Sequence, residues 1–383
     1  MALTVKTGGM RICIVTNGFP FDGVFAYDVQ ARHLLHALSA HDTDVVNLAW
    51  IEGAPPAPPA DDAVLARTRY RPSPVATYPT PVELSAFDRM GYDVVVTLVD
   101  VVLLLPPRHT GSATRIVVVY PSLYRPLPPG EVATLRAADV VVCLTEGPAQ
   151  ALRAAGLADV RVVPHVVATA APAQNRDGPR MFVCNAMNYE ASQRKGHAAL
   201  LVAFRAYLDA GGSGVLVMHA PSNGAGVDLA RVAAALRLPG DRLLLSQRVA
   251  KDAPTVLYSV AHVVCVPSKA EGFGMAAVEA LAAGVPVVVN STTALSDHAH
   301  AAEPGSVVVV PSAAVEFHPP GDGFWEVPDP ARLAAAMRAL DDPDEYRRAH
   351  EAAVRGAAAW RARCSFEAVA AAWRALLTSL PWA

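Results

Sequence analysis

The chain has 383 residues, of which 52% are hydrophobic and 17% charged, and its formal net charge is −3. This length suits two domains of about 150–200 residues, each large enough to bury a core of its own. The composition excludes a disordered chain, and the mixture of acidic and basic residues along the sequence argues against nucleic-acid binding.

In the first half, short β-branched runs alternate with longer segments rich in alanine and leucine. Strands are predicted at 11–16, 44–50, 92–99, 115–120, 139–144 and 160–167, and helices at 25–39, 131–137 and 146–156. This alternation is typical of a parallel, doubly wound sheet of the Rossmann type. The proline- and alanine-rich stretch 52–63 interrupts it and is interpreted as a surface loop or short disordered insert.

A second change in composition, at residues 168–180, is interpreted as an interdomain linker. The alternation then restarts, with strands predicted at 181–186, 214–219, 242–246, 262–267, 285–289 and 306–311, and helices at 196–211, 227–237, 252–260 and 275–283. Residues 316–329 are interpreted as a surface loop, followed by helices at 330–340, 343–358 and 365–380. We therefore predict an α/β protein with an N-terminal domain at 1–168, a linker at 169–180, a second domain at 181–360 and a terminal helix within 361–383.

The five cysteines are widely spaced and mostly lie in apolar, strand-like runs. They predict buried, reduced thiols in a cytoplasmic protein. No C-x-x-C or H-x-x-x-H cluster is present, so we expect neither a metal site nor another cofactor. The N-terminus lacks the pattern of a signal peptide, and the apolar stretch 92–107 is interrupted by Asp93 and Asp100, so we expect at most a peripheral membrane contact.

The most informative stretch is SKAEGFGMAAVEALAAGVPVVV, residues 268–289. It places Glu271 and Glu279 eight residues apart, across a glycine-rich loop that leads into an alanine-rich helix. Gly272 and Gly274 would let the backbone approach a ligand, and the first N–H groups of the helix would face an anion. The two carboxylates could then bind hydroxyls on either side of a diphosphate. Taken alone, the same pattern also fits ordinary α/β architecture.

The full string is similar to the signature of the retaining glycosyltransferases of family 4, approximately PS-x-x-E-G-F/Y-G-x-x-x-x-E-A-x-A-x-G-x-P-V-V. The matching residues are Pro267, Ser268, Glu271, Gly272, Phe273, Gly274, Glu279, Ala280, Ala282, Gly284, Pro286 and Val287. The resemblance implies the GT-B fold, in which two Rossmann-like domains face each other across a cleft. It also implies transfer of a sugar, without a metal, from a GDP- or UDP-linked donor to a glycan, a lipid or another hydroxyl acceptor. Helix 365–377 resembles the family's terminal helix that crosses back to the first domain; a simple capping helix is the alternative.

The same resemblance implies roles for individual residues. Glu279 would hold the ribose and Glu271 the sugar hydroxyls, while Arg194 and Lys195 would neutralise the leaving diphosphate. Lys195 and the following glycine match the second half of the family's G-R-x-x-x-x-K-G pattern, but Glu190 stands where the pattern has its arginine. The remaining residues expected to contact the nucleotide-sugar are Ser268, Gly272, Phe273, Gly274, Met275 and, in the first domain, Gly23.

Other positions are assigned with less support. No histidine follows the strand 115–120, so no catalytic histidine is assigned. The polar turn 290–293 and Asp297 are candidates for contact with the acceptor or the diphosphate. Asp342 and Asp344 form an Asp-x-Asp sequence between helices, which we interpret as a helix cap and turn.

Two other functions remain open. A sugar-nucleotide epimerase with a GT-B-like fold shares the two-domain cleft but would use acid and base residues on the sugar. A non-catalytic nucleotide-sugar-binding protein is the other alternative, because the first arginine and the histidine of the family pattern are missing.

Overall fold

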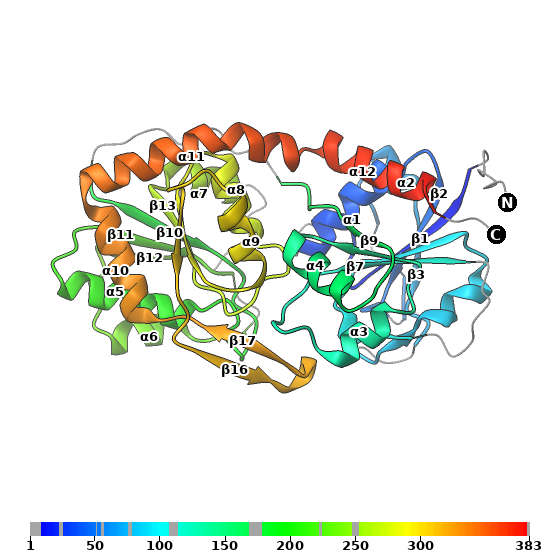
Figure 1. Cartoon of the computed structure of the whole chain (residues 1–383), viewed down its shortest axis with the longest axis horizontal. Helices are drawn as coiled ribbons and strands as arrows, with labels where there is room; N and C mark the ends of the chain where they lie inside the picture. The colour runs from blue at the N-terminus through cyan, green and yellow to red at the C-terminus, as the bar shows by residue number, and fades with distance from the viewer. Residues whose placement is uncertain are drawn as a thin grey trace.

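The computed structural model describes residues 9–22, 26–50, 52–54, 57–75, 79–106, 114–167, 178–221, 224–246 and 253–380. Within these ranges the chain folds into two α/β domains that lie side by side along the long axis of the molecule (Figure 1). Each domain is built on a parallel sheet with helices packed against it, so the predicted α/β class with two Rossmann-like domains is confirmed. Gly23 and most of the predicted linker, residues 168–177, lie outside the described residues.

The N-terminal domain contains a seven-stranded parallel sheet in the order β3-β2-β1-β5-β7-β8-β9. The chain builds the sheet outward from β1 in both directions, as in doubly wound folds, so a crevice is expected at the carboxyl ends of the central strands. The strands are β1 Arg11–Thr16, β2 Asp42–Asn47, β3 Arg69–Pro72, β5 Val94–Thr97, β7 Arg115–Tyr120, β8 Val140–Cys143 and β9 Val160–Val162. The helices are α1 Ala26–Ala37, α2 Ala63–Arg67, α3 Pro129–Leu135 and α4 Glu146–Ala154, and β4 Val82–Glu83 pairs with β6 Leu104–Leu105.

The C-terminal domain contains a six-stranded parallel sheet in the order β12-β11-β10-β13-β14-β15. Its strands are β10 Met181–Asn185, β11 Val215–His219, β12 Leu243–Ser246, β13 Val263–Val266, β14 Val287–Asn290 and β15 Val307–Val310. Its helices are α5 His197–Asp209, α6 Leu229–Ala235, α7 Ala253–Val260, α8 Met275–Ala282, α9 Thr293–Ala301, α10 Pro330–Asp341 and α11 Pro343–Arg363, and α12 Phe366–Thr378 ends the described chain.

The central strands consist almost entirely of β-branched residues because helices cover both faces of each sheet. In β7, Val117 and Val119 face one hydrophobic cluster, and Val118 faces the other. The first of these clusters also includes Val369 of α12 and Val264 of the C-terminal domain. The two domains therefore share part of one core.

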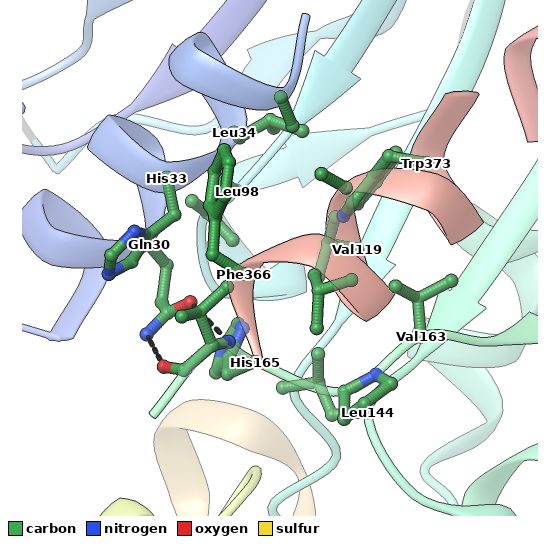
Figure 2. A pocket seen from close by; sticks show the side chains of 15 residues that line it. Gln30, His33, Leu34, Leu98, Val119, Leu144, Val163, His165, Phe366 and Trp373 are labelled. Carbon is green, nitrogen blue, oxygen red and sulfur yellow. Dashed lines mark hydrogen bonds between the residues drawn. The ribbon is translucent and has the colours of Figure 1, made fainter. Parts of the chain in front are cut away.

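The chain crosses between the domains along one side of the molecule. Helix α11 lies over the C-terminal domain, and α12 packs against α1 of the N-terminal domain (Figure 1). Between α11 and α12, the carbonyl of Cys364 accepts a hydrogen bond of 3.1 Å from the N–H of Val167, which belongs to the N-terminal domain. Nearby, the Gln30 side chain exchanges two hydrogen bonds with the backbone of Val166, at 2.9 and 3.1 Å (Figure 2).

Several predicted elements differ from the structure. The loop predicted at 316–329 is wrong: β16 Ala314–His318 and β17 Gly323–Val327 form an antiparallel hairpin, with Phe317 opposite Phe324. The strand predicted at 160–167 ends at Val162, because the following turn contains Pro164, which has no N–H to donate to a sheet. Helices α2 and α9 and strand β3 were not predicted.

Candidate functional site

The loop between β13 and α8 carries Glu271 and ends at Gly274, which precedes the first residue of α8. Gly274 adopts a left-handed conformation with φ of +78°, which glycine accommodates without strain. The loop after β10 lies against this segment: a Cβ atom at Gly196 would overlap the carbonyl oxygen of Pro267, so only glycine allows the approach. This contact brings Lys195 to Glu271.

Glu271 is the centre of a buried ionic cluster and is only 7% exposed. Lys195 Nζ donates to both of its carboxylate oxygens, at 2.7 and 2.9 Å, and Ser268 Oγ donates to Oε1 at 2.6 Å. Burial by itself raises the pKa of Glu271, but the charges of Lys195 and Arg194 and these hydrogen bonds outweigh it, so the pKa lies below its usual value. The carboxylate is therefore ionised at neutral pH.

Arg194 is held at the same cluster by Glu190. The guanidinium donates from Nε to Glu190 Oε2 at 3.0 Å and from Nη2 to Oε1 at 2.6 Å, and Nη1 donates to the carbonyl of Ala270 at 3.1 Å. Its Nη1 also lies 3.9 Å from Glu271 Oε2. The acidic residue at the position of the missing arginine thus pairs with the neighbouring Arg194, and Arg194, Lys195, Ser268 and Glu271 lie together.

Glu279 occupies a different environment, on α8, and is 8% exposed. It accepts a hydrogen bond from Tyr258 Oη at 2.8 Å, and Tyr258 in turn accepts one from Asn185 Nδ2 at 3.0 Å. Asn185 ends β10, and its Oδ1 lies 3.0 Å from Nδ1 of His219, which ends β11. Burial raises the pKa of Glu279 to about 7. The two motif glutamates therefore have opposite pKa shifts.

The N-terminal domain covers the loop that carries Glu271. A Cβ atom at Gly272 would lie 2.6 Å from the Cβ of Pro121, which follows β7. The ring of Phe273 packs edge-on against His165, with centroids 5.3 Å apart, and Gln30 Nε2 contacts Met275 Sδ at 3.8 Å. Phe273 and Met275, which were predicted to bind the nucleotide-sugar, thus have side chains that contact the other domain.

The hairpin β16–β17 also reaches the N-terminal domain. Tyr124 stacks on Trp325, with ring centroids 6.3 Å apart, and its hydroxyl lies 2.8 Å from His318 Nδ1. On the same domain, Asp100 accepts a hydrogen bond from Tyr27 Oη at 2.6 Å. Sequence reasoning could not identify Tyr124 or Trp325 as contacts, because their proximity arises only from the packing of the two domains.

The polar residues assigned with less support form hydrogen bonds with other groups of the protein. Asn290 Nδ2 donates to the carbonyls of Ser268 and Glu326, and Asp297 accepts a hydrogen bond from the N–H of Gly147. Asp342 caps α11 by accepting from the N–H groups of Asp344 and Glu345, which confirms the interpretation of the Asp-x-Asp sequence.

Among the described residues, no group of three or more His, Cys, Asp or Glu side chains is arranged to hold a metal ion. The same part of the chain contains no helix with the length and apolarity needed to cross a membrane.

Comparison with solved structures identifies the fold. Sucrose-phosphate synthase from Thermosynechococcus elongatus is 19% identical, with a TM-score of 0.69 over 97% of this chain and 99% of that one. The UDP-forming α,α-trehalose-phosphate synthase from Burkholderia vietnamiensis is 17% identical, with a TM-score of 0.67 over 98% of each chain. Anabaena HepE, solved in complex with UDP and glucose, is 14% identical, with a TM-score of 0.65 over 97% of this chain and 100% of that one. The two domains therefore have the GT-B fold.

Part of the C-terminal domain also matches a known family by sequence. Residues 187–317 match the family model described as Glycosyl transferases group 1. The matched segment contains Glu190, Arg194, Lys195, Glu271 and Glu279, the five charged side chains described above. No curated protein matches the chain significantly.

Proposed function

We propose that the chain is a retaining glycosyltransferase that moves a sugar from a nucleotide diphosphate-sugar to a hydroxyl of a glycan, a lipid or another acceptor, without a metal or other cofactor. The family model and the GT-B fold support sugar transfer. The UDP held by Anabaena HepE and the description of the trehalose-phosphate synthase as UDP-forming favour UDP over GDP. The five free, buried cysteines favour a reducing compartment, and we propose the cytoplasm.

The single observation that carries this proposal is the buried cluster of Lys195, Glu271 and Ser268 beside the N-terminus of α8. In the cluster, Lys195 and Glu271 neutralise each other. A bound diphosphate would accept hydrogen bonds from Lys195 Nζ and from the first N–H groups of α8, because an ammonium group and a helix N-terminus both favour an anion. Glu271 would then accept hydrogen bonds from the sugar hydroxyls in place of those from Lys195.

Glu279 would hold the ribose. Its carboxylate has one hydrogen bond from a tyrosine and lies among neutral polar groups, so the hydroxyls of a ribose would supply the further donors that a buried carboxylate needs. Binding of the ribose would lower the pKa of Glu279 towards its usual value.

Catalysis would depend on the leaving group. Negative charge grows on the diphosphate as the bond to the sugar breaks, and Lys195 and Arg194 would stabilise that charge more in the transition state than in the ground state. The acceptor hydroxyl would attack from the face that the diphosphate leaves and would lose its proton to a diphosphate oxygen. Contact between the domains would exclude water and limit hydrolysis.

The test is sugar transfer from UDP- and GDP-sugars by the Lys195→Ala and Glu271→Ala variants. Each variant should transfer at about one hundredth of the wild-type rate, since a charge-assisted contact at the reacting centre contributes about 2–4 kcal/mol. The matched control is Glu303→Ala, which removes only a surface ion pair with Arg355. Rates close to wild type in both site variants would refute the assignment. Tight nucleotide binding by the wild type without transfer from any donor would favour a binding protein.

A further inference from the structure

Side chains of helix α9 form hydrogen bonds with the backbone of the loop that carries Glu271. Thr293 Oγ1 donates to the carbonyl of Glu271 at 2.8 Å and accepts from its N–H at 3.1 Å. One turn further along α9, His298 Nε2 contacts the carbonyl of Phe273. A shift of α9 would therefore move the backbone of residues 271–273 with it.

The same helix reaches the N-terminal domain through Asp297. Its Oδ2 accepts a hydrogen bond of 2.9 Å from the N–H of Gly147, in the first turn of α4. Figure 1 shows α9 and α4 meeting between the domains. A carboxylate at this end of a nine-residue helix is favoured both by the free N–H groups and by the helix dipole.

The N-terminus of α4 is not capped by the side chain of its own N-cap residue. Thr145 stands at the capping position, yet its side chain makes no capping hydrogen bond, and its buried Oγ1 has no partner in the part of the chain that the structure describes. At Gly147, a Cβ atom would lie 2.5 and 2.6 Å from the two carboxylate oxygens of Asp297. Asp297 thus caps α4 from the other domain, and the absence of a side chain at Gly147 permits the approach.

We propose that Asp297 is a positioning residue that couples contact between the domains to the geometry of the loop at Glu271. The inference rests on the proposed function. When the domains meet, Asp297 binds the N-terminus of α4 and fixes α9, and α9 fixes the backbone of Glu271 and Phe273 through Thr293 and His298. Asp297 does not touch the substrates.

The test is a double-mutant cycle with Asp297→Ala and Gly147→Ala. The first variant removes the carboxylate, and the second places a methyl group against it. Each should lower kcat for transfer about tenfold and raise the fraction of donor hydrolysed, while the dissociation constant for UDP changes less than threefold. The double variant should be no slower than Asp297→Ala, because both changes break the same contact. Asp297→Asn keeps an acceptor for the N–H of Gly147 and should recover most of kcat.

The matched control is Gly130→Ala. Gly130 is the second residue of α3, as Gly147 is of α4, but a Cβ atom there meets nothing within 4 Å. This variant should keep the wild-type kcat. Unchanged kcat and hydrolysis in Asp297→Ala, or losses that multiply in the double variant, would overturn the coupling.

A readout that needs no activity separates this inference from the proposed function. In small-angle X-ray scattering without substrate, Asp297→Ala and Gly147→Ala should each have a larger radius of gyration than the wild type and Gly130→Ala. Identical scattering of all four proteins would overturn the interdomain contact even if transfer is confirmed. A wild type that transfers no sugar refutes the proposed function alone, since the scattering comparison still tests the contact.

Discussion

Replacing Glu279 by glutamine removes a buried ionisable group and keeps an oxygen that can accept the hydrogen bond of Tyr258. Burial raises the pKa of Glu279 from 4.5 to about 7, so in the folded protein the ionised form is disfavoured. Below pH 4.5 the carboxyl is protonated in both the folded and the unfolded chain and its ionisation costs nothing. As the pH rises from 4.5 through 7, the unfolded chain loses this proton first, and the wild type loses stability.

The magnitude follows from the two pKa values. At about 1.36 kcal/mol per pKa unit, the difference between 4.5 and about 7 corresponds to roughly 3 kcal/mol of unfolding free energy. The Glu279→Gln variant should therefore match the wild type near pH 4.5, become more stable than it as the pH rises, and keep a constant advantage above pH 7. A stabilising substitution at a proposed ligand-binding residue is expected when the site is not optimised for stability.

The assay is urea unfolding of both proteins at pH 5, 6, 7 and 8, with and without UDP. The control, Glu303→Gln, makes the same chemical change at a carboxylate on the surface, where it pairs with Arg355. UDP should stabilise the wild type more than Glu279→Gln, because the variant lacks the charged acceptor proposed for the ribose. A stability difference that is the same at pH 5 and pH 8 would refute the reasoning about the buried carboxyl.

Two further predictions concern buried groups outside the proposed site. Burial lowers the pKa of His165 to about 3, so the unfolded chain binds a proton below pH 6.5 that the folded chain does not, and stability should fall as the pH drops from 6.5 towards 3. In urea unfolding, His165→Phe, which keeps a ring against Phe273, should reduce the loss of unfolding free energy between pH 6.5 and 4.5 by roughly 2 kcal/mol; an unchanged pH dependence contradicts this. Burial also raises the pKa of all five cysteine thiols. At pH 8 these thiols should therefore react with an aromatic disulfide only as fast as the chain unfolds. Labelling of the native protein within minutes would count against their burial.

The fold and the motif loop could be predicted because their signals are local. A buried parallel strand such as β7 needs a run of β-branched residues, and the loop before α8 needs glycine at position 274; both requirements are visible in a few consecutive residues. The same locality explains why Glu271 and Glu279 could be singled out as a pair.

The rest depends on contacts between distant segments. The hairpin β16–β17 is one example: Val315 and Phe317 are exposed, and Trp325 is buried against Tyr124 of the other domain, so the segment does not alternate around a core of its own domain. Tyr258, the partner of Glu279, comes from a preceding helix and has no spacing that marks it. Packing of helices and domains, which no short pattern encodes, created these contacts.

The hydrogen bond between Val167 and Cys364 joins the two domains at one edge of their interface. Cys364 lies between α11 and α12, so a rotation of the domains about this contact would have its pivot on the side of these two helices (Figure 1). Rotation of the domains about a pivot displaces nearby atoms least and distant atoms most. The hairpin β16–β17, whose Trp325 stacks on Tyr124, lies on the side opposite these helices (Figure 1). If the protein is the transferase proposed above, a bulky acceptor would enter on the hairpin side, and separation of Tyr124 from Trp325 would open that entrance.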